Sequence, residues 1–318
     1  MSETLVVNEI YLSLQGESTF AGLPCIFVRL TACNLRCSYC DTAYAFTEGK
    51  KQSLAEILNE IRRLAEPFKK SGGAVEQPIP PRPAVLSPVA GGENAPKRFS
   101  RTDPLNHPSC FSPPPPLGER AGVRGVRPSE VHGEGPGEGG PSAIPQKNLS
   151  LPLIELTGGE PLLQPNALPL MKALCDNGFT VLIETSGALD ISQVDPRVRR
   201  IMDLKCPGSG EVKRNRWANL PHLKATDEIK FVIGAVEDYE WAKRQIAERN
   251  LAAICPLLMS WVQPLAPEQQ DKSLKRVPAG QTPISRRDLA ERIIADALPV
   301  RFQAQLHKLI WPPEQRGV

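Results

Sequence analysis

Three cysteines near the start of the chain, Cys33, Cys37 and Cys40, have the residue type and spacing of a metal-binding loop. No other cysteine lies within seven residues of them, so the loop offers three thiolates and no local fourth ligand. A closed zinc site uses four protein ligands. An iron–sulfur cluster on three thiolates instead keeps one iron open for a small molecule. The ligand count favours the cluster, while a zinc site with a distant fourth ligand and three ordinary core thiols remain alternatives.

The bulk composition argues against several classes of partner. The 318-residue chain has a net charge of only +3 and its basic residues are scattered, which gives no indication of direct nucleic-acid binding. The longest apolar run, 251–259, contains Pro256 and is too short to span a bilayer. The first residues lack the basic and apolar regions of a signal peptide, and the local clustering of thiols does not indicate a disulfide framework. We therefore expect a cytoplasmic protein without a membrane partner.

One segment, 71–150, differs in composition from the rest. It holds 16 of the 33 prolines and 12 of the 24 glycines. Such a segment buries too little apolar surface to offset the entropy of ordering its backbone. We expect 71–150 to be a disordered insertion in a single domain made of 1–70 and 151–318. Cys110 and His132 within it are not expected to be ligands.

Outside this segment, apolar strand-like runs alternate with helical ones. Strands are expected over 5–7, 26–30, 153–156, 180–183, 200–204 and 228–233, with a polar loop over 12–18. Helices are expected over 54–65, which begins at the capping box of Ser53 and Glu56 and stops at Pro67, over 168–177, which ends at Gly178, and over 237–250 and 286–298. The alternation predicts an α/β fold with a parallel sheet covered by helices.

Polar and glycine-bearing runs follow several of these strands directly. They are the cysteine loop and the segments 157–161, 184–187 and 203–207. In α/β folds the carboxyl ends of parallel strands meet at one edge of the sheet, where ligands bind. These four segments are therefore expected to converge at one mouth.

The motifs together resemble a known superfamily. The cysteine spacing, with the aromatic Tyr39 just before Cys40, resembles the cluster motif of radical S-adenosylmethionine enzymes, and the run 157–161 (Thr-Gly-Gly-Glu-Pro) resembles the glycine-rich strand end of the same enzymes. A narrower resemblance, to the 7-carboxy-7-deazaguanine synthase family, is carried by 12–18, Gly22, 27–30, 33–35, 40–42, 184–187, 203–207 and 305–308. It covers about 1–68 and 151–318, has no counterpart to 71–150, and implies a partial, modified (β/α) TIM-like barrel.

The resemblance implies a [4Fe-4S] cluster on the three cysteines, with S-adenosylmethionine on the open iron. The residues implied in binding S-adenosylmethionine are Tyr39, Cys40, Asp41, Gly158, Gly159, Glu160, Thr185, Ser186, Asp203, Leu204 and Lys205. Some of them have structural alternatives: Tyr39 could simply pack, the two glycines could form an ordinary turn, and Lys205 could make a solvated ion pair.

The resemblance also implies a Mg²⁺ ion on Thr42, whose hydroxyl could alternatively cap the loop. The implied substrate contacts are Leu14, Gln15, Gly16, Glu17, Arg29, Thr157 and His307. Arg29 could pair with Glu155 instead, and His307 could pack beside Trp311.

The implied reaction is a carbon–nitrogen lyase reaction. It converts 6-carboxy-5,6,7,8-tetrahydropterin to 7-carboxy-7-deazaguanine with loss of ammonia, in queuosine biosynthesis. The resemblance also implies a homodimer and an electron donor such as flavodoxin, without direct contact to tRNA. Two other functions remain open from sequence: an activating enzyme for glycyl-radical proteins, and a zinc-binding interaction module.

Overall fold

A computed structural model describes residues 3–70, 74–75, 149–265, 267–312 and 315–318 of the chain. The predicted insertion therefore lies almost entirely outside the described residues. At its two boundaries, β4 (Ala74–Val75) and β5 (Leu149–Ser150) pair as a short antiparallel sheet. None of the described helices is both long and apolar enough to cross a membrane.

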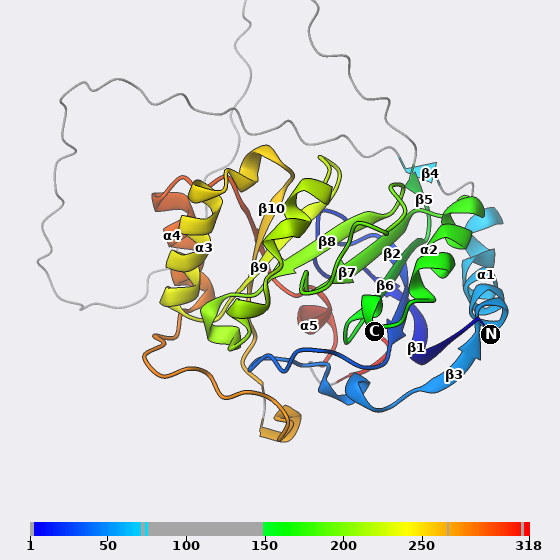
Figure 1. Cartoon of the computed structure of the whole chain (residues 1–318), viewed down its shortest axis with the longest axis horizontal. Helices are drawn as coiled ribbons and strands as arrows, with labels where there is room; N and C mark the ends of the chain where they lie inside the picture. The colour runs from blue at the N-terminus through cyan, green and yellow to red at the C-terminus, as the bar shows by residue number, and fades with distance from the viewer. Residues whose placement is uncertain (1–2, 71–73, 76–148, 266, 313–314) are drawn as a thin grey trace, which may run out of the picture. The chain divides into compact units, whose positions relative to one another are not determined.

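Nine strands form one sheet in the order β11-β10-β9-β8-β7-β6-β2-β1-β3 (Figure 1). They are β1 (Thr4–Leu14), β2 (Pro24–Leu30), β3 (Lys50–Ser53), β6 (Leu153–Gly158), β7 (Val181–Thr185), β8 (Arg199–Leu204), β9 (Glu228–Ile233), β10 (Leu257–Trp261) and β11 (Arg301–Gln303). All neighbours from β2 to β11 are parallel, whereas β1 and β3 join antiparallel at one end. Among the described residues β3 and β11 do not pair, so the sheet is an incomplete barrel.

Helices cover one face of the sheet. They are α1 (Leu54–Lys70), α2 (Ala167–Asp176), α3 (Val236–Glu248) and α4 (Arg286–Ala295), and a short α5 (His307–Ile310) follows β11. Figure 1 shows α1 and α2 beside β2 and β6, and α3 and α4 beside β9 and β10. The main core lies under these helices. The predicted α/β architecture is therefore confirmed.

The side-chain alternation of the strands separates two apolar layers. In β6, Ile154 and Leu156 pack in the main core under the helices, whereas Leu153 faces the opposite way. Leu153 belongs to a second, smaller cluster on the inner face of the sheet. That cluster consists of Phe20, Cys25, Phe27, Leu149, Leu153, Leu182 and Ile201. We call this cluster the apolar floor. Toward the carboxyl ends of the same strands, the inner face carries polar side chains instead.

Two sequence predictions about element boundaries are wrong. The run 12–18 is not all loop, because β1 continues to Leu14 and pairs with β2 over 24–30. Helix α1 does not stop at Pro67. It continues to Lys70, because the half-buried Phe68 extends the apolar stripe, and a proline this near the helix end removes only one backbone hydrogen bond. Strands β3, β4, β5, β10 and β11 were not predicted, although β10 begins within the apolar run 251–259.

Candidate active site

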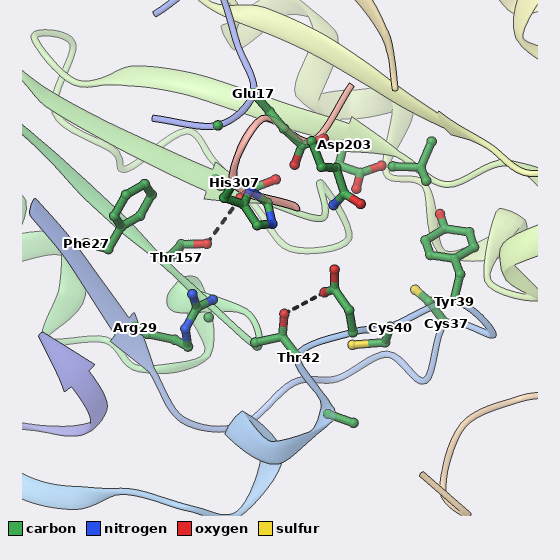
Figure 2. A pocket seen from close by; sticks show the side chains of 18 of the residues that line it. Glu17, Phe27, Arg29, Cys37, Tyr39, Cys40, Thr42, Thr157, Asp203 and His307 are labelled. Atoms are coloured by element: carbon green, nitrogen blue, oxygen red, sulfur yellow. Dashed lines mark hydrogen bonds between the residues drawn. The ribbon is translucent and has the colours of Figure 1, made fainter. Parts of the chain in front are cut away.

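A cavity of about 880 Å³ opens on the inner face of the sheet. Its wall contains the cysteine loop and the ends of β6, β7 and β8, which confirms their predicted convergence. Figure 2 shows Cys37, Cys40 and Tyr39 on one side of this cavity and Arg29 on the other, with Thr42 between them. Of the predicted site residues, all but Glu160 and Leu204 line it.

The cysteine loop is held at its start and in its middle by backbone hydrogen bonds. At its start, the N–H of Gly159 donates to the carbonyl of Leu30 (3.2 Å) and the N–H of Glu160 to that of Ala32 (2.8 Å). In its middle, the N–H of Ser38 donates to the carbonyl of Ser209 (3.1 Å). The loop is thus fixed between the ends of β6 and β8, which is the rigidity that a ligand-bearing loop requires.

The three thiols face the cavity as separate ligands. Cys33 and Cys40 are partly exposed, and Cys37 is buried. Burial raises the pKa of Cys37 to about 11 and that of Cys40 to about 12, so ligation must displace their protons. Among the described residues, no three Cys, His, Asp or Glu side chains are grouped as one metal ion requires. A [4Fe-4S] cluster instead presents a separate iron to each thiolate, and this donor set fits it better than zinc.

The glycine pair after β6 is required by backbone packing. Gly158 has φ +125°, and a Cβ there would overlap the backbone of Leu30. A Cβ at Gly159 would overlap the carbonyl of Ala32. The two glycines therefore let the end of β6 pack directly on the start of the cysteine loop, and both also line the cavity.

Two predicted S-adenosylmethionine contacts lie elsewhere. Leu204 is 1% exposed and packs in the main core. Glu160 is fully buried, and its carboxylate accepts hydrogen bonds from Thr185 Oγ1 (2.9 Å), from Ser186 N (2.8 Å) and from Leu162 N (3.1 Å). In this arrangement Glu160 orients Thr185 and Ser186 from behind. The run 157–161 correctly predicted that Glu160 follows the end of β6, but it did not predict the direction of its side chain.

Of the residues that line the cavity, two have a buried side-chain polar atom without a partner among the described residues: Asp203, at Oδ1, and Tyr39, at its hydroxyl. The other oxygen of Asp203 pairs with Lys205 Nζ at 2.7 Å, and both side chains are about one-tenth exposed, so this ion pair is buried rather than solvated. A buried acceptor without a partner is costly. Asp203 Oδ1 is therefore free to accept a hydrogen bond from a ligand.

Thr42 lies at the centre of the cavity wall. Its hydroxyl donates to Asp41 Oδ1 (2.8 Å), and Asp41 Oδ2 pairs with Lys308 Nζ (2.5 Å). Burial would raise the pKa of Asp41, but the charge of Lys308 outweighs it and holds that pKa well below its usual range. The hydroxyl does not cap the 3-10 turn that follows it (Ala43–Phe46), so the structure does not bear out the capping alternative.

Arg29 pairs with Glu9 (2.7 Å), not with Glu155 as the sequence allowed. Its Nη2 also donates to the hydroxyl of Tyr11 (2.5 Å), and Tyr44 donates to Glu9 (3.0 Å). The guanidinium lies near the rings of both tyrosines. Arg29 is therefore held in one orientation at the cavity wall, where its planar fork suits a ligand carboxylate.

The loop after β1 enters the cavity from the opposite end of the sheet. Because β1 is antiparallel to β2, its last residue, Leu14, pairs with Pro24, the first residue of β2. From there Gln15 reaches Glu155 on β6, and Glu17 pairs with Lys230 on β9 (3.5 Å). This loop closes the end of the cavity nearest the apolar floor. The strand pattern alone led us to expect only loops at the carboxyl ends of the parallel strands, and it did not predict this contribution.

Several lining residues were not predicted as site residues. Tyr11, Glu155, Glu184, Lys230 and Ser260 are among them. Lys230 donates to Glu184, and Ser260 donates to Glu17. The sequence does contain a signal for Lys230, because this lysine stands among apolar residues within the strand 228–233. A buried strand contains a charged residue only where that charge is paired.

The ring of His307 lies directly against Gly16, since a Cβ built on Gly16 would be 2.5 Å from His307 Nδ1. Burial lowers the pKa of His307, so the ring is neutral near pH 7. We predict that Gly16→Ala displaces this ring and raises the KM for the substrate about tenfold, a loss of about 1.4 kcal/mol of binding. The affinity for S-adenosylmethionine serves as the internal control and should change little. An unchanged KM would show that His307 does not touch the substrate.

The fold was compared with solved structures. The crystal structure of QueE from Escherichia coli matches with a TM-score of 0.51 over 96% of this chain and 95% of that one, at 18% sequence identity. At this identity the match shows a shared fold. No protein-family model matches the sequence.

Curated relatives match over nearly the whole chain. The 7-carboxy-7-deazaguanine synthase of Koribacter versatilis is 33% identical over 98% of this chain and 99% of its own length. The protein of the same name from Chlorobaculum tepidum is 31% identical over 99% of this chain and 97% of its own length. Such identity, sustained from end to end, shows that the chain belongs to the 7-carboxy-7-deazaguanine synthase family.

Proposed function

We propose that this chain converts 6-carboxy-5,6,7,8-tetrahydropterin into 7-carboxy-7-deazaguanine with loss of ammonia, in queuosine biosynthesis. The observation that carries the proposal is the cavity itself. It places the three thiols of the cysteine loop and the side chains of Gln15, Arg29 and His307 around one volume. An activating enzyme for a protein substrate does not need this enclosed set of polar groups, and a zinc module does not need the cavity.

The cysteine loop is suited to hold a [4Fe-4S] cluster, which with S-adenosylmethionine supplies a 5′-deoxyadenosyl radical for hydrogen abstraction. The residues around the cysteine loop would bind and orient S-adenosylmethionine. Asp203 has the free acceptor for ribose, Lys205 carries a fixed positive charge for a carboxylate, and Thr185 and Ser186 are oriented by Glu160. Tyr39 closes the side of the cavity nearest the thiols.

The substrate contacts we propose lie on the far side of the cavity. Arg29, fixed by Glu9, suits the pterin carboxylate, because a guanidinium binds a carboxylate with two parallel hydrogen bonds. Gln15 and Glu17 present amide and carboxylate groups that match the donors and acceptors of a pterin ring, and Leu14, Gly16, Thr157 and His307 complete the wall.

We propose a Mg²⁺ ion between the two halves of the cavity, on the hydroxyl oxygen of Thr42 and the substrate carboxylate. Magnesium keeps several waters and substrate oxygens, so one protein oxygen suffices. We predict that Thr42→Val abolishes the stimulation of turnover by Mg²⁺, while Thr42→Ser keeps it. A titration of the initial rate with MgCl₂ measures the effect, and equal stimulation in both variants would contradict the proposal.

Further parts of the proposal concern the whole protein. We propose a single catalytic domain made of 1–70 and 151–318, because the cavity named above draws its lining residues from both of these parts. The seven cysteines in the described part are free thiols, as suits a reducing compartment such as the cytoplasm. We propose a small electron-donor protein such as flavodoxin as the reductant of the cluster, and a homodimer as the assembly.

The function is tested with the full chain, reconstituted anaerobically with iron and sulfide. The reduced protein is incubated with the carboxytetrahydropterin, S-adenosylmethionine and Mg²⁺, and the products are separated by chromatography. We expect one ammonia for each 7-carboxy-7-deazaguanine formed. Cleavage of S-adenosylmethionine without any deazaguanine would overturn the proposed function.

A further inference from the structure

A group of charged side chains lies at the end of the cavity nearest the apolar floor. Its members are three carboxyls, Glu17, Glu155 and Glu184, and the ammonium of Lys230, all of which line the cavity. The ammonium is 4% exposed and pairs directly with Glu17 and Glu184. Glu155 makes no ion pair among the described residues. If all four groups were ionised, two negative charges would be uncompensated, and the buried position of Glu155 would make its own charge costly.

Glu155 is the one carboxyl of this group that no cation contacts among the described residues. It is 1% exposed, and its direct neighbours in the sheet, Phe27 on β2 and Leu182 on β7, both belong to the apolar floor. One of its oxygens accepts a hydrogen bond from the Gln15 amide. No hydrogen bond to its other oxygen, Oε1, is found among the described residues.

Five titratable groups around Glu155 interact with it electrostatically. Tyr11 on β1 and Cys25 on β2 lie on one side, Glu184 on β7 lies diagonally across, and Glu17 and Lys230 lie beyond it. Burial, followed by the charge of Glu184, raises the pKa of Glu155 to about 8. Glu155 therefore holds a proton at pH 7.

Glu184 has the opposite environment although it is close by. Its carboxylate accepts hydrogen bonds from Lys230 and from Thr157 Oγ1 (3.2 Å). Burial would raise its pKa, but Lys230 outweighs burial and the pKa is lowered, so Glu184 is ionised. Two nearby carboxyls whose environments drive their protonation apart are the arrangement that supplies an acid and a base to one reaction.

We propose that Glu155 is the acid that protonates the departing amine of the substrate, with Glu184 as the base that accepts the carbon-bound proton. This assignment rests on the proposed function. The O–H bond of Glu155 breaks as an N–H bond forms, and the C–N bonding electrons leave with the nitrogen as ammonia. The adjacent C–H proton passes to Glu184, and its electrons form the ring double bond. Transfer of one proton from Glu184 back to Glu155 restores both groups, so no oxidant or reductant is needed.

The decisive variant is Glu155→Gln, which keeps the shape and an acceptor for Gln15 but holds no acidic proton. We expect it to abstract deuterium from C6-deuterated pterin within about threefold of the wild-type rate, and to release ammonia at least about 100-fold more slowly, the usual range for a lost general acid. The matched control is Glu228→Gln, another buried carboxyl of the sheet, which accepts from Thr19 and does not line the cavity. In this control, the rates of deuterium abstraction and of ammonia release should both stay close to the wild-type rates.

A second measurement needs no cofactor. Infrared difference spectra of the metal-free protein should show a protonated carboxyl band that disappears as the pH rises through about 8, and that is absent in Glu155→Gln but present in Glu228→Gln. Ammonia release by the wild type should fall over the same pH interval, because only the acid form can donate. Equal losses in abstraction and ammonia release, or a loss of less than tenfold, would overturn the assignment. A wild-type protein that makes no deazaguanine would instead overturn the function.

Discussion

Replacing Cys37 with serine is expected to abolish cluster loading and turnover while the fold is retained. Cys37 lines the cavity but lies in a loop held by backbone hydrogen bonds from the ends of β6 and β8, which do not depend on its thiol. Serine is a far poorer ligand for iron than a thiolate. After anaerobic reconstitution we expect the variant to lack both the broad visible absorption of the cluster and detectable deazaguanine formation.

The matched control for this variant is Cys175→Ser. Cys175 is a partly exposed free thiol on α2 that does not line the cavity. It should load iron and turn over like the wild type. Circular dichroism of all three proteins checks that the fold is intact. A fully loaded, active Cys37→Ser protein would mean that the cysteine loop is not the cluster site.

Replacing Lys230 with methionine is expected to give the largest loss of stability of any single change in the cavity. The ammonium is buried and pairs with both Glu17 and Glu184, and these two carboxylates together raise its own pKa well above normal against the opposing effect of burial. Removing one partner of a buried pair leaves an uncompensated charge and costs about 3–5 kcal/mol. Urea unfolding of the metal-free protein measures this loss.

Two further variants separate charge from packing. The double variant Lys230→Met/Glu184→Gln also removes one of the two carboxylates that Lys230→Met leaves without a cation. About half of the stability lost in Lys230→Met should therefore return, although no contact is restored. Lys224→Met is the surface-side control, because Lys224 is one-third exposed and its partner Asp227 keeps a second cation, Arg200. A loss below 1 kcal/mol for Lys230→Met would contradict the ion network described here.

The sequence allowed the outline of the site to be predicted because its motifs are local. The cysteine loop, 157–161, 184–187 and 203–207 each follow a strand directly, and parallel strands place such segments at one edge. The residue types at these positions also restrict their chemistry. Local motifs therefore sufficed for the wall of the cavity that holds the thiols.

The charge network could not be predicted in this way, because long-range register creates it. Gln15 and Glu155 are 140 positions apart, and Glu17 and Lys230 are 213 apart. Nothing local in the sequence says that the loop after β1 turns back into the sheet. The direction of the Glu160 side chain was missed for the same reason, since it depends on how β6 packs against β7.

The central claim is that pterin and S-adenosylmethionine meet in one cavity, between the cysteine loop and Arg29. Transfer of an isotope between the two molecules tests it most directly. The reduced enzyme is incubated with pterin deuterated at C6, and the 5′ carbon of the adenosyl group is analysed by mass spectrometry. We predict that deuterium appears there. Cleavage of S-adenosylmethionine with no deuterium in the adenosyl product would contradict the account.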